Sequence, residues 1–155
     1  MGLLHVEERV PLAPLTTFAV GGPARFLAEV EDEDELLAAF AWARARSVPV
    51  FVLGGGSNLV VADRGLDALV VRLRPRGLRF APGDDDRVLV RASAGEPWDD
   101  LVARCVARDL AGLECLSGIP GQVGATPIQN VGAYGCEVAD VLHEVEVLRP
   151  ATSQP

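Results

Sequence analysis

The chain has 155 residues, 49% of them apolar, which is enough for one domain with a buried core. Its 14 basic residues are outnumbered by 22 acidic ones, and the net charge of −8 argues against nucleic acid or an anionic membrane surface as a partner. Every basic residue is Arg, and the absence of Lys excludes a P-loop nucleotide site and a Schiff-base lysine enzyme.

The first half of the chain predicts a β-α-β unit. Phe26–Val30 is expected to be a strand, and Asp32 followed by Glu35 is typical of a capping box for a helix that continues to about Ala45. The apolar face of this helix is expected at positions with helical spacing: Leu36, Leu37, Phe40 and Ala43. Val50–Leu53 is an uninterrupted apolar run, so we expect a buried strand parallel to the first.

The second half predicts further strands around one helix. Leu69–Leu73 and Val88–Ala94 are expected strands, and Pro75–Asp86 is expected either to link two subdomains or to form an exposed hairpin. Pro97 is expected in the first turn of a helix whose buried stripe consists of Trp98, Leu101, Val102 and Cys105. Alternating apolar residues predict a final strand at Leu142–Leu148.

A glycine-rich segment, residues 54–58 with the sequence GGGSN, directly follows the predicted strand Val50–Leu53. Ligands of open α/β sheets collect at the carboxyl ends of strands, and glycines there let backbone N–H groups surround an anion. Ser57 and Asn58 add side-chain donors, so a pyrophosphate or similar group is the expected ligand. The alternative is a tight turn that binds nothing. The segment is not a Rossmann fingerprint, because Leu59 occupies the third glycine position.

A second glycine-rich segment spans residues 116–135 and reads LSGIPGQVGATPIQNVGAYG. Long uncharged loops of this kind inside a compact domain usually surround a ligand. Glycines, small residues, amides and hydroxyls suit a flat ligand with polar edges, such as an isoalloxazine ring. The alternative is an irregular loop that only satisfies its own backbone.

Other features predict no metal site and no covalent chemistry. Cys105, Cys115 and Cys136 are odd in number and lack ligand spacing, which indicates reduced thiols. His5 and His143 are far apart, so no metal is expected. The N-terminus lacks the features of a signal peptide, and no apolar run reaches the length of a membrane span. We therefore expect a cytoplasmic protein without a membrane partner.

Taken in order, several motifs make the sequence recognisable. They are residues 15–24 (LTTFAVGGPA), 53–58 (LGGGSN), 94–98 (AGEPW), 112–114 (GLE), 119–124 (IPGQVG) and 129–135 (QNVGAYG). With these motifs in register over about residues 12–149, the chain closely resembles the N-terminal part of the UDP-N-acetylenolpyruvoylglucosamine reductase (MurB) family of bacterial peptidoglycan synthesis. The composition, rich in Ala and with Arg in place of Lys, resembles that of a high-GC bacterium.

The resemblance implies an α+β fold, the FAD-binding domain of the vanillyl-alcohol-oxidase/p-cresol-methylhydroxylase (PCMH) type. It implies one such domain over residues 1–155, with a first small α/β subdomain at about 12–74 and an incomplete second one at about 75–150. FAD would lie between them. The cofactor-binding residues are then expected to be Gly54, Gly55, Gly56, Ser57, Asn58 and Leu59 around the pyrophosphate loop, and Ile119, Pro120, Gly121, Gly124, Ala125, Thr126, Asn130, Gly132, Ala133, Tyr134 and Gly135 along the flavin and its ribityl chain.

In the family that the chain resembles, NADPH reduces FAD, and the flavin passes hydride to the enolpyruvyl group of a UDP-sugar. A Ser, a Glu and an Arg complete that chemistry, and all three lie beyond the last residue of this chain. The substrate-binding domain is also missing, so we expect no catalytic residue here and an inactive chain, either truncated or a solitary flavin-binding module. The alternatives are a non-enzymatic flavin module and another PCMH-type flavoprotein, such as an oxidase.

Overall fold

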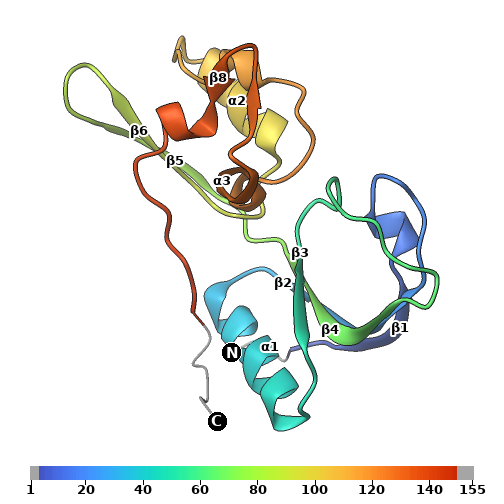
Figure 1. Cartoon of the computed structure of the whole chain (residues 1–155). Coiled ribbons are helices and arrows are strands. Elements are labelled where there is room, and N and C mark those ends of the chain that lie inside the picture. Colours follow the sequence, from blue (N-terminus) through green and yellow to red (C-terminus); the bar gives the residue numbers. More distant parts are fainter. Residues whose placement is uncertain (1–3, 150–155) are drawn as a thin grey trace.

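The structure is a computed structural model and describes residues 4–149 (Figure 1). Its strands and helices follow in the order β1 (Glu7–Pro11), β2 (Pro23–Val30), α1 (Glu33–Ala45), β3 (Val50–Leu53), β4 (Leu66–Leu73), β5 (Leu78–Pro82), β6 (Val88–Ala92), α2 (Trp98–Val106), α3 (Thr126–Gln129), β7 (Gly132–Ala133) and β8 (Cys136–Glu137). Short 3-10 helices are η1 (Ala13–Leu15), η2 (Glu114–Leu116), η3 (Val123–Ala125) and η4 (Val138–Asp140). This mixture of helices and strands confirms the predicted α+β class.

Strands β1 to β4 form a sheet in the order β1-β2-β4-β3. Strand β1 is antiparallel to β2, whereas β4 is parallel to both β2 and β3. The predicted β-α-β unit is therefore present with its parallel orientation, but β4 lies between the two strands that helix α1 connects. Sequence periodicity does not reveal such an insertion, because every strand of a buried parallel sheet has the same apolar composition.

Helix α1 begins at the predicted cap. The Asp32 carboxylate accepts a hydrogen bond from the Glu35 N–H at 2.8 Å, while the Glu35 carboxylate accepts one from the N–H of Glu31 rather than of Asp32. The predicted apolar face is partly wrong. Leu37 is 47% exposed, and the fully buried helix positions are Ala39 and Ala43. Small residues at these positions let the helix backbone approach the sheet closely.

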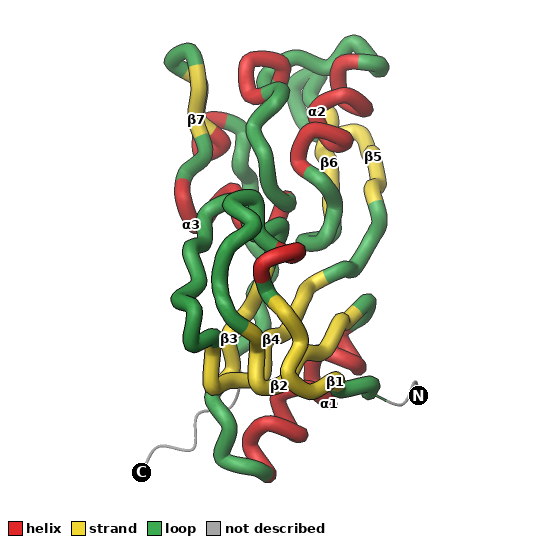
Figure 2. Tube along the Cα trace, turned by 90° about the vertical axis from the view of Figure 1, so that its right-hand side faces the viewer, coloured by secondary structure: helices red, strands yellow, loops and turns green. Residues whose placement is uncertain are grey.

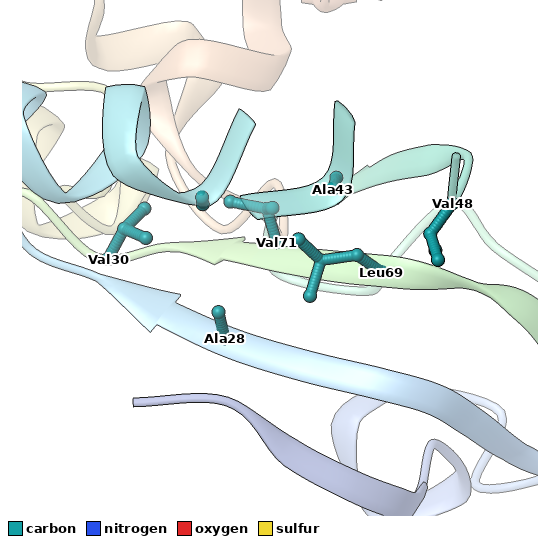
Figure 3. Close-up of a cluster of buried hydrophobic side chains, with 7 residues drawn as sticks. Ala28, Val30, Ala43, Val48, Leu69 and Val71 are labelled. Atoms are coloured by element: carbon teal, nitrogen blue, oxygen red, sulfur yellow. The ribbon is translucent and has the colours of Figure 1, made fainter. Parts of the chain in front are cut away.

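The sheet is covered by apolar residues on both faces, because successive side chains of a strand point to opposite sides. On the α1 face, Val30 of β2 and Leu69 and Val71 of β4 pack against Ala43 (Figure 3). On the other face, Val70 of β4 packs with Ala24 and Leu27 of β2, with Leu53 at the end of β3, and with Leu12 and Val61 from the connecting loops. Burial on both faces fixes the strand register near the carboxyl end of β3.

The second half of the chain has its own core. The hairpin β5–β6, expected as one of two alternatives, packs on helix α2, and the predicted stripe of α2 is confirmed as buried together with Leu116 and Val138: Trp98, Leu101, Val102 and Cys105. The Trp98 indole N–H donates to the Leu116 carbonyl at 2.9 Å. Pro97 is the N-cap of the helix and not part of its first turn.

The predicted strand at Leu142–Leu148 is wrong. This segment is extended, yet it pairs with no other strand among the residues that the structure describes, and Figure 1 shows it running alone away from β8. Val147 in this segment is 63% exposed. An alternating pattern favours extended backbone, but a strand also requires a partner edge.

Candidate functional site

The first glycine-rich segment, residues 54–58, begins where β3 leaves the sheet. Gly56 is buried with a φ of +70°, and a Cβ at this position would lie 2.1 Å from the Leu15 carbonyl oxygen. The Thr17 N–H donates to the Gly56 carbonyl at 3.0 Å. Both contacts hold the segment against the loop after β1, and the left-handed conformation without a side chain explains why glycine is needed at this point.

The second segment is anchored at its centre to the start of helix α2. The Trp98 N–H donates to the Gly121 carbonyl at 3.0 Å, and the Val123 N–H donates to the Glu96 carbonyl at 2.9 Å. Gly124 donates to the Ala94 carbonyl at 2.9 Å, and a Cβ on Gly124 would come within 2.7 Å of the Ala94 Cβ. Residues 121–124 therefore follow residues 94–98 at backbone distance.

The two segments meet. A Cβ on Gly55 would lie 3.2 Å from the Gly121 Cα, and the Ser57 hydroxyl donates to the Pro120 carbonyl at 3.3 Å. In Figure 2 the loops that carry them fill the middle of the molecule, between the sheet of β1–β4 and the part that contains α2, β5 and β6. An open cavity of about 160 Å³ lies at the junction, lined by Ser57, Asn58, Ile119, Pro120, Gly121, Gln122, Ala125, Thr126, Gln129 and Val131.

The backbone donors beside and in this cavity suit an anion held without cationic side chains. Among the hydrogen bonds described for residues 4–149, the N–H groups of Gly55, Gly56, Ser57 and Asn58 have no protein acceptor. No residue in the cavity lining is charged. Consecutive N–H groups without a protein acceptor at the carboxyl end of a parallel strand can surround an anion such as a pyrophosphate. Such a group fits the residues present.

The structure brings together part of the predicted site. The lining contains Ser57, Asn58, Ile119, Pro120, Gly121, Ala125 and Thr126. Gly54, Gly55, Gly56 and Gly124 belong to the same two segments, and Leu59 directly follows the first one, but none of these five residues lines the cavity.

The remaining predicted residues lie in or beside the β7–β8 hairpin, outside the cavity lining. Gly132 and Ala133 form β7, Gly135 is in the turn that follows, and Tyr134 in that turn is 91% exposed. The Asn130 side-chain amide donates to the Glu137 carboxylate at 2.6 Å and accepts from the Ala139 N–H at 3.3 Å. Asn130 therefore also has a structural role, since it fixes the base of this hairpin. Direct contact between the hairpin and a flavin stays a prediction.

Three lining residues were not predicted: Gln122, Gln129 and Val131. All three lie within the second glycine-rich segment, and no feature of the local sequence distinguishes them from their neighbours. Gln122 donates through Nε2 to the Leu73 carbonyl at 3.2 Å. Its connection to β4 depends on the tertiary structure and has no counterpart in the local sequence.

Two carboxylates form hydrogen bonds with the chain at and just before the start of the second segment. The Asp99 carboxylate accepts hydrogen bonds from the Gly118 N–H at 2.6 Å and the Ser117 hydroxyl at 2.9 Å, and these bonds lower the pKa of Asp99. The Glu114 carboxylate likewise accepts from backbone N–H groups, including that of Gly112 at 2.6 Å, and its pKa is lowered. Neither carboxylate lines the cavity, so both act on the shape of the loop.

Comparisons with known proteins identify the family of this chain. Residues 24–153 match the family described as FAD binding domain. The chain is 54% identical over 137 residues to a UDP-N-acetylenolpyruvoylglucosamine reductase of Saccharopolyspora erythraea, covering 88% of this chain and 37% of the relative. It is 45% identical over 151 residues to the reductase of the same name from Pseudomonas syringae, covering 97% of this chain and 44% of the relative.

A solved structure is also similar. The crystal structure of UDP-N-acetylenolpyruvylglucosamine reductase (MurB) from Thermus caldophilus aligns with a TM-score of 0.69 at 36% identity, over 89% of this chain and 47% of that one. The chain thus spans about two fifths of the length of the curated relatives just named. None of the helices described over residues 4–149 is long and apolar enough to cross a membrane.

Proposed function

The chain belongs to the family of FAD binding domains, and from this premise we propose that FAD binds in the cavity between its two glycine-rich segments. The observation that carries the proposal is the set of N–H groups at Gly55, Gly56, Ser57 and Asn58, which have no protein acceptor in the described part of the chain. These groups would hold the pyrophosphate, and the backbone of residues 119–126 would lie along the flavin. Both the pyrophosphate and the flavin assignments assume a PCMH-type fold, which the likeness to the Thermus caldophilus enzyme supports.

We further propose that the cofactor binds between two subdomains, about residues 12–74 and 75–150. The separation of the apolar clusters supports this division. Two clusters draw their members from Leu4 to Leu73, and the third draws its members from Leu78 to Val138. A cofactor between two separately packed units would be held by loops from both, as the cavity lining is.

We propose that the chain is the FAD-binding part of a reductase of UDP-N-acetylglucosamine enolpyruvate, the reductase that the relatives' names give. We further propose, from the resemblance to the family, that the complete enzyme uses NADPH and acts in the cytoplasm in peptidoglycan synthesis, and so in cell wall biogenesis and cell shape. Bound FAD would supply hydride transfer. The residues of this chain would bind and orient it. Because the chain spans only part of the relatives, we expect no NADPH oxidation dependent on the UDP-sugar from the 155 residues alone.

A titration that compares FAD, FMN and riboflavin tests the cofactor proposal. Flavin fluorescence should be quenched with an affinity for FAD at least about tenfold higher than for riboflavin, because only FAD presents a pyrophosphate to the free N–H groups. Purified protein should also be yellow if it retains the cofactor. Equal affinities for FAD and riboflavin would contradict a pyrophosphate site at residues 55–58, and no quenching by any flavin would contradict FAD binding itself.

A further inference from the structure

Strand β4 extends one residue beyond its neighbour β3. Leu53, the last residue of β3, pairs with Arg72, whereas Leu73 pairs only with Val30 of β2. The Leu69 N–H donates to the Pro49 carbonyl at 2.8 Å, so alternate β4 residues from Leu69 onward direct their backbone groups toward β3. The Leu73 carbonyl follows this alternation and points to the place that β3 has left.

The side chain of Gln122 occupies that place. Its Nε2 donates to the Leu73 carbonyl at 3.2 Å, and its Oε1 lies 3.3 Å from where a Cβ on Gly54 would be. A primary amide has the same donor and acceptor groups as a peptide, so it can continue a ladder of backbone hydrogen bonds. The backbone of Gln122 belongs to the other half of the molecule, where it forms a bridge with Pro97.

The same alternation identifies the amide that Gln122 replaces. Pro49 accepts from β4, so every second residue after it faces β4, and the next such residue beyond Leu53 is Gly55. Had β3 continued, the Gly55 N–H would donate to the Leu73 carbonyl. In the structure that carbonyl is satisfied by Gln122, and the Gly55 N–H has no acceptor among the described residues.

We propose that Gln122 is a positioning residue that completes the β3–β4 ladder with its side-chain amide and thereby leaves the Gly55 N–H free for the pyrophosphate. A partly buried carbonyl needs a donor, and two donors compete for this one. When Gln122 supplies the donor, the first glycine-rich segment can turn out of the sheet. The inference rests on the proposed FAD site. It explains why the first glycine-rich segment is open to the cofactor at that site.

The experiment compares Gln122→Met with Gln129→Met in the full chain. Both changes replace a cavity-lining glutamine by an apolar side chain of similar length, but no hydrogen bond of the Gln129 side chain is described. We expect Gln122→Met to weaken FAD binding by about five- to twentyfold, and to lower the melting temperature of the apoprotein by about 2–4 °C. Amide exchange at residues 53–58 should change in this variant, while the β1–β2 pair stays as in wild type. Gln129→Met should leave the apoprotein melting temperature and this exchange unchanged.

A second variant, Gln122→Glu, tests the same hydrogen bond if Gln122→Met folds poorly. Gln122→Glu preserves shape, but its carboxylate has no proton for the Leu73 carbonyl until it is protonated. Its stability deficit relative to wild type should therefore shrink as the pH falls below about 5. Apoprotein stability and exchange at residues 53–58 equal to wild type in both Gln122 variants would overturn the inference. Absence of FAD binding by wild type would instead overturn the proposed function, and the apoprotein measurements would still decide the role of Gln122.

Discussion

Residues 4–73 and 78–149 each supply one glycine-rich segment to the cavity, but different interactions hold the two segments in place. Residues 54–58 extend from a sheet of paired strands with apolar clusters on both faces. Residues 116–135 lie in a region whose described strands form two-stranded sheets. Their path is fixed by individual hydrogen bonds to Ala94, Glu96, Trp98 and Asp99. The first loop therefore inherits its position from strand register, and the second depends on single contacts.

The largest expected effect concerns the cores of the two regions. Leu69→Ala removes a fully buried side chain at the centre of the sheet, and we expect a loss of about 4 kcal/mol in the free energy of unfolding. Leu101→Ala in α2, where the side chain is 5% exposed, should cost about 3 kcal/mol. Urea unfolding measures both, with Trp42 reporting on the first region and Trp98 on the second.

The pattern of those transitions tests whether the regions are separate. We expect the two regions to unfold in separate transitions. Leu69→Ala should then shift the urea midpoint reported by Trp42 and leave the midpoint reported by Trp98 nearly unchanged. One shared transition that both substitutions shift equally would show a single cooperative unit. An unchanged melting curve for Leu101→Ala would contradict its assigned place in the core.

The next effect concerns the point where the two segments touch. Gly55→Val places a branched side chain whose Cβ would lie 3.2 Å from the Gly121 Cα, so the segments must separate and the anion site must deform. We expect FAD affinity to fall at least about tenfold, measured by flavin fluorescence quenching. Gly118→Ala is the matched control, because its Cβ would meet nothing within 4 Å and would only strain a φ of +78°. Wild-type affinity in Gly55→Val would rule out this contact as part of the site.

Protonation of Asp99 in acid should lower the stability of the second region, residues 78–149. Its pKa is lowered by the Gly118 N–H and the Ser117 hydroxyl, so its contribution to stability is present above the unfolded-state pKa of about 3.9 and is lost as the pH falls through the lowered folded-state value. Asp99→Asn cannot titrate. We expect this variant to be less stable than wild type at neutral pH and equal to it in strong acid. Stability curves that stay parallel down to low pH would disprove this assignment.

The smallest effects concern ion pairs on the surface. Arg91 and Glu146 join β6 to the unpaired segment 142–149, and their side chains are 76% and 78% exposed, so Arg91→Ala should cost at most about 0.5 kcal/mol. Arg72 joins β4 to Glu29 of β2 with an N–O distance of 2.6 Å and is 28% exposed, so Arg72→Ala should cost more, up to about 1 kcal/mol. A reversed order, measured by thermal unfolding, would show that segment 142–149 is held more firmly than its exposure indicates.

Local sequence determined the elements whose physical cause is local. The cap at Asp32, the stripe from Trp98 to Cys105 and a strand at Val50–Leu53 were predicted, because capping, helical spacing and glycine punctuation act between residues close in the chain. The expected burial of that strand is wrong, since β3 lies at the edge of the sheet and Val52 is 48% exposed. The sequence also located both glycine-rich segments and, through resemblance, the FAD binding domain family that the comparison confirms.

Tertiary structure decided whatever depends on a distant partner. Strand β4 inserts between β2 and β3, and Leu142–Leu148 pairs with no strand that the structure describes, because strand pairing is settled between residues far apart in the chain. The same holds for Gln122, whose amide donates to the carbonyl of Leu73, 49 residues earlier in the chain. The sequence could supply the glycines of residues 54–56, but only the fold places them beside the cavity and leaves the N–H groups of Gly55 and Gly56 without an acceptor among residues 4–149.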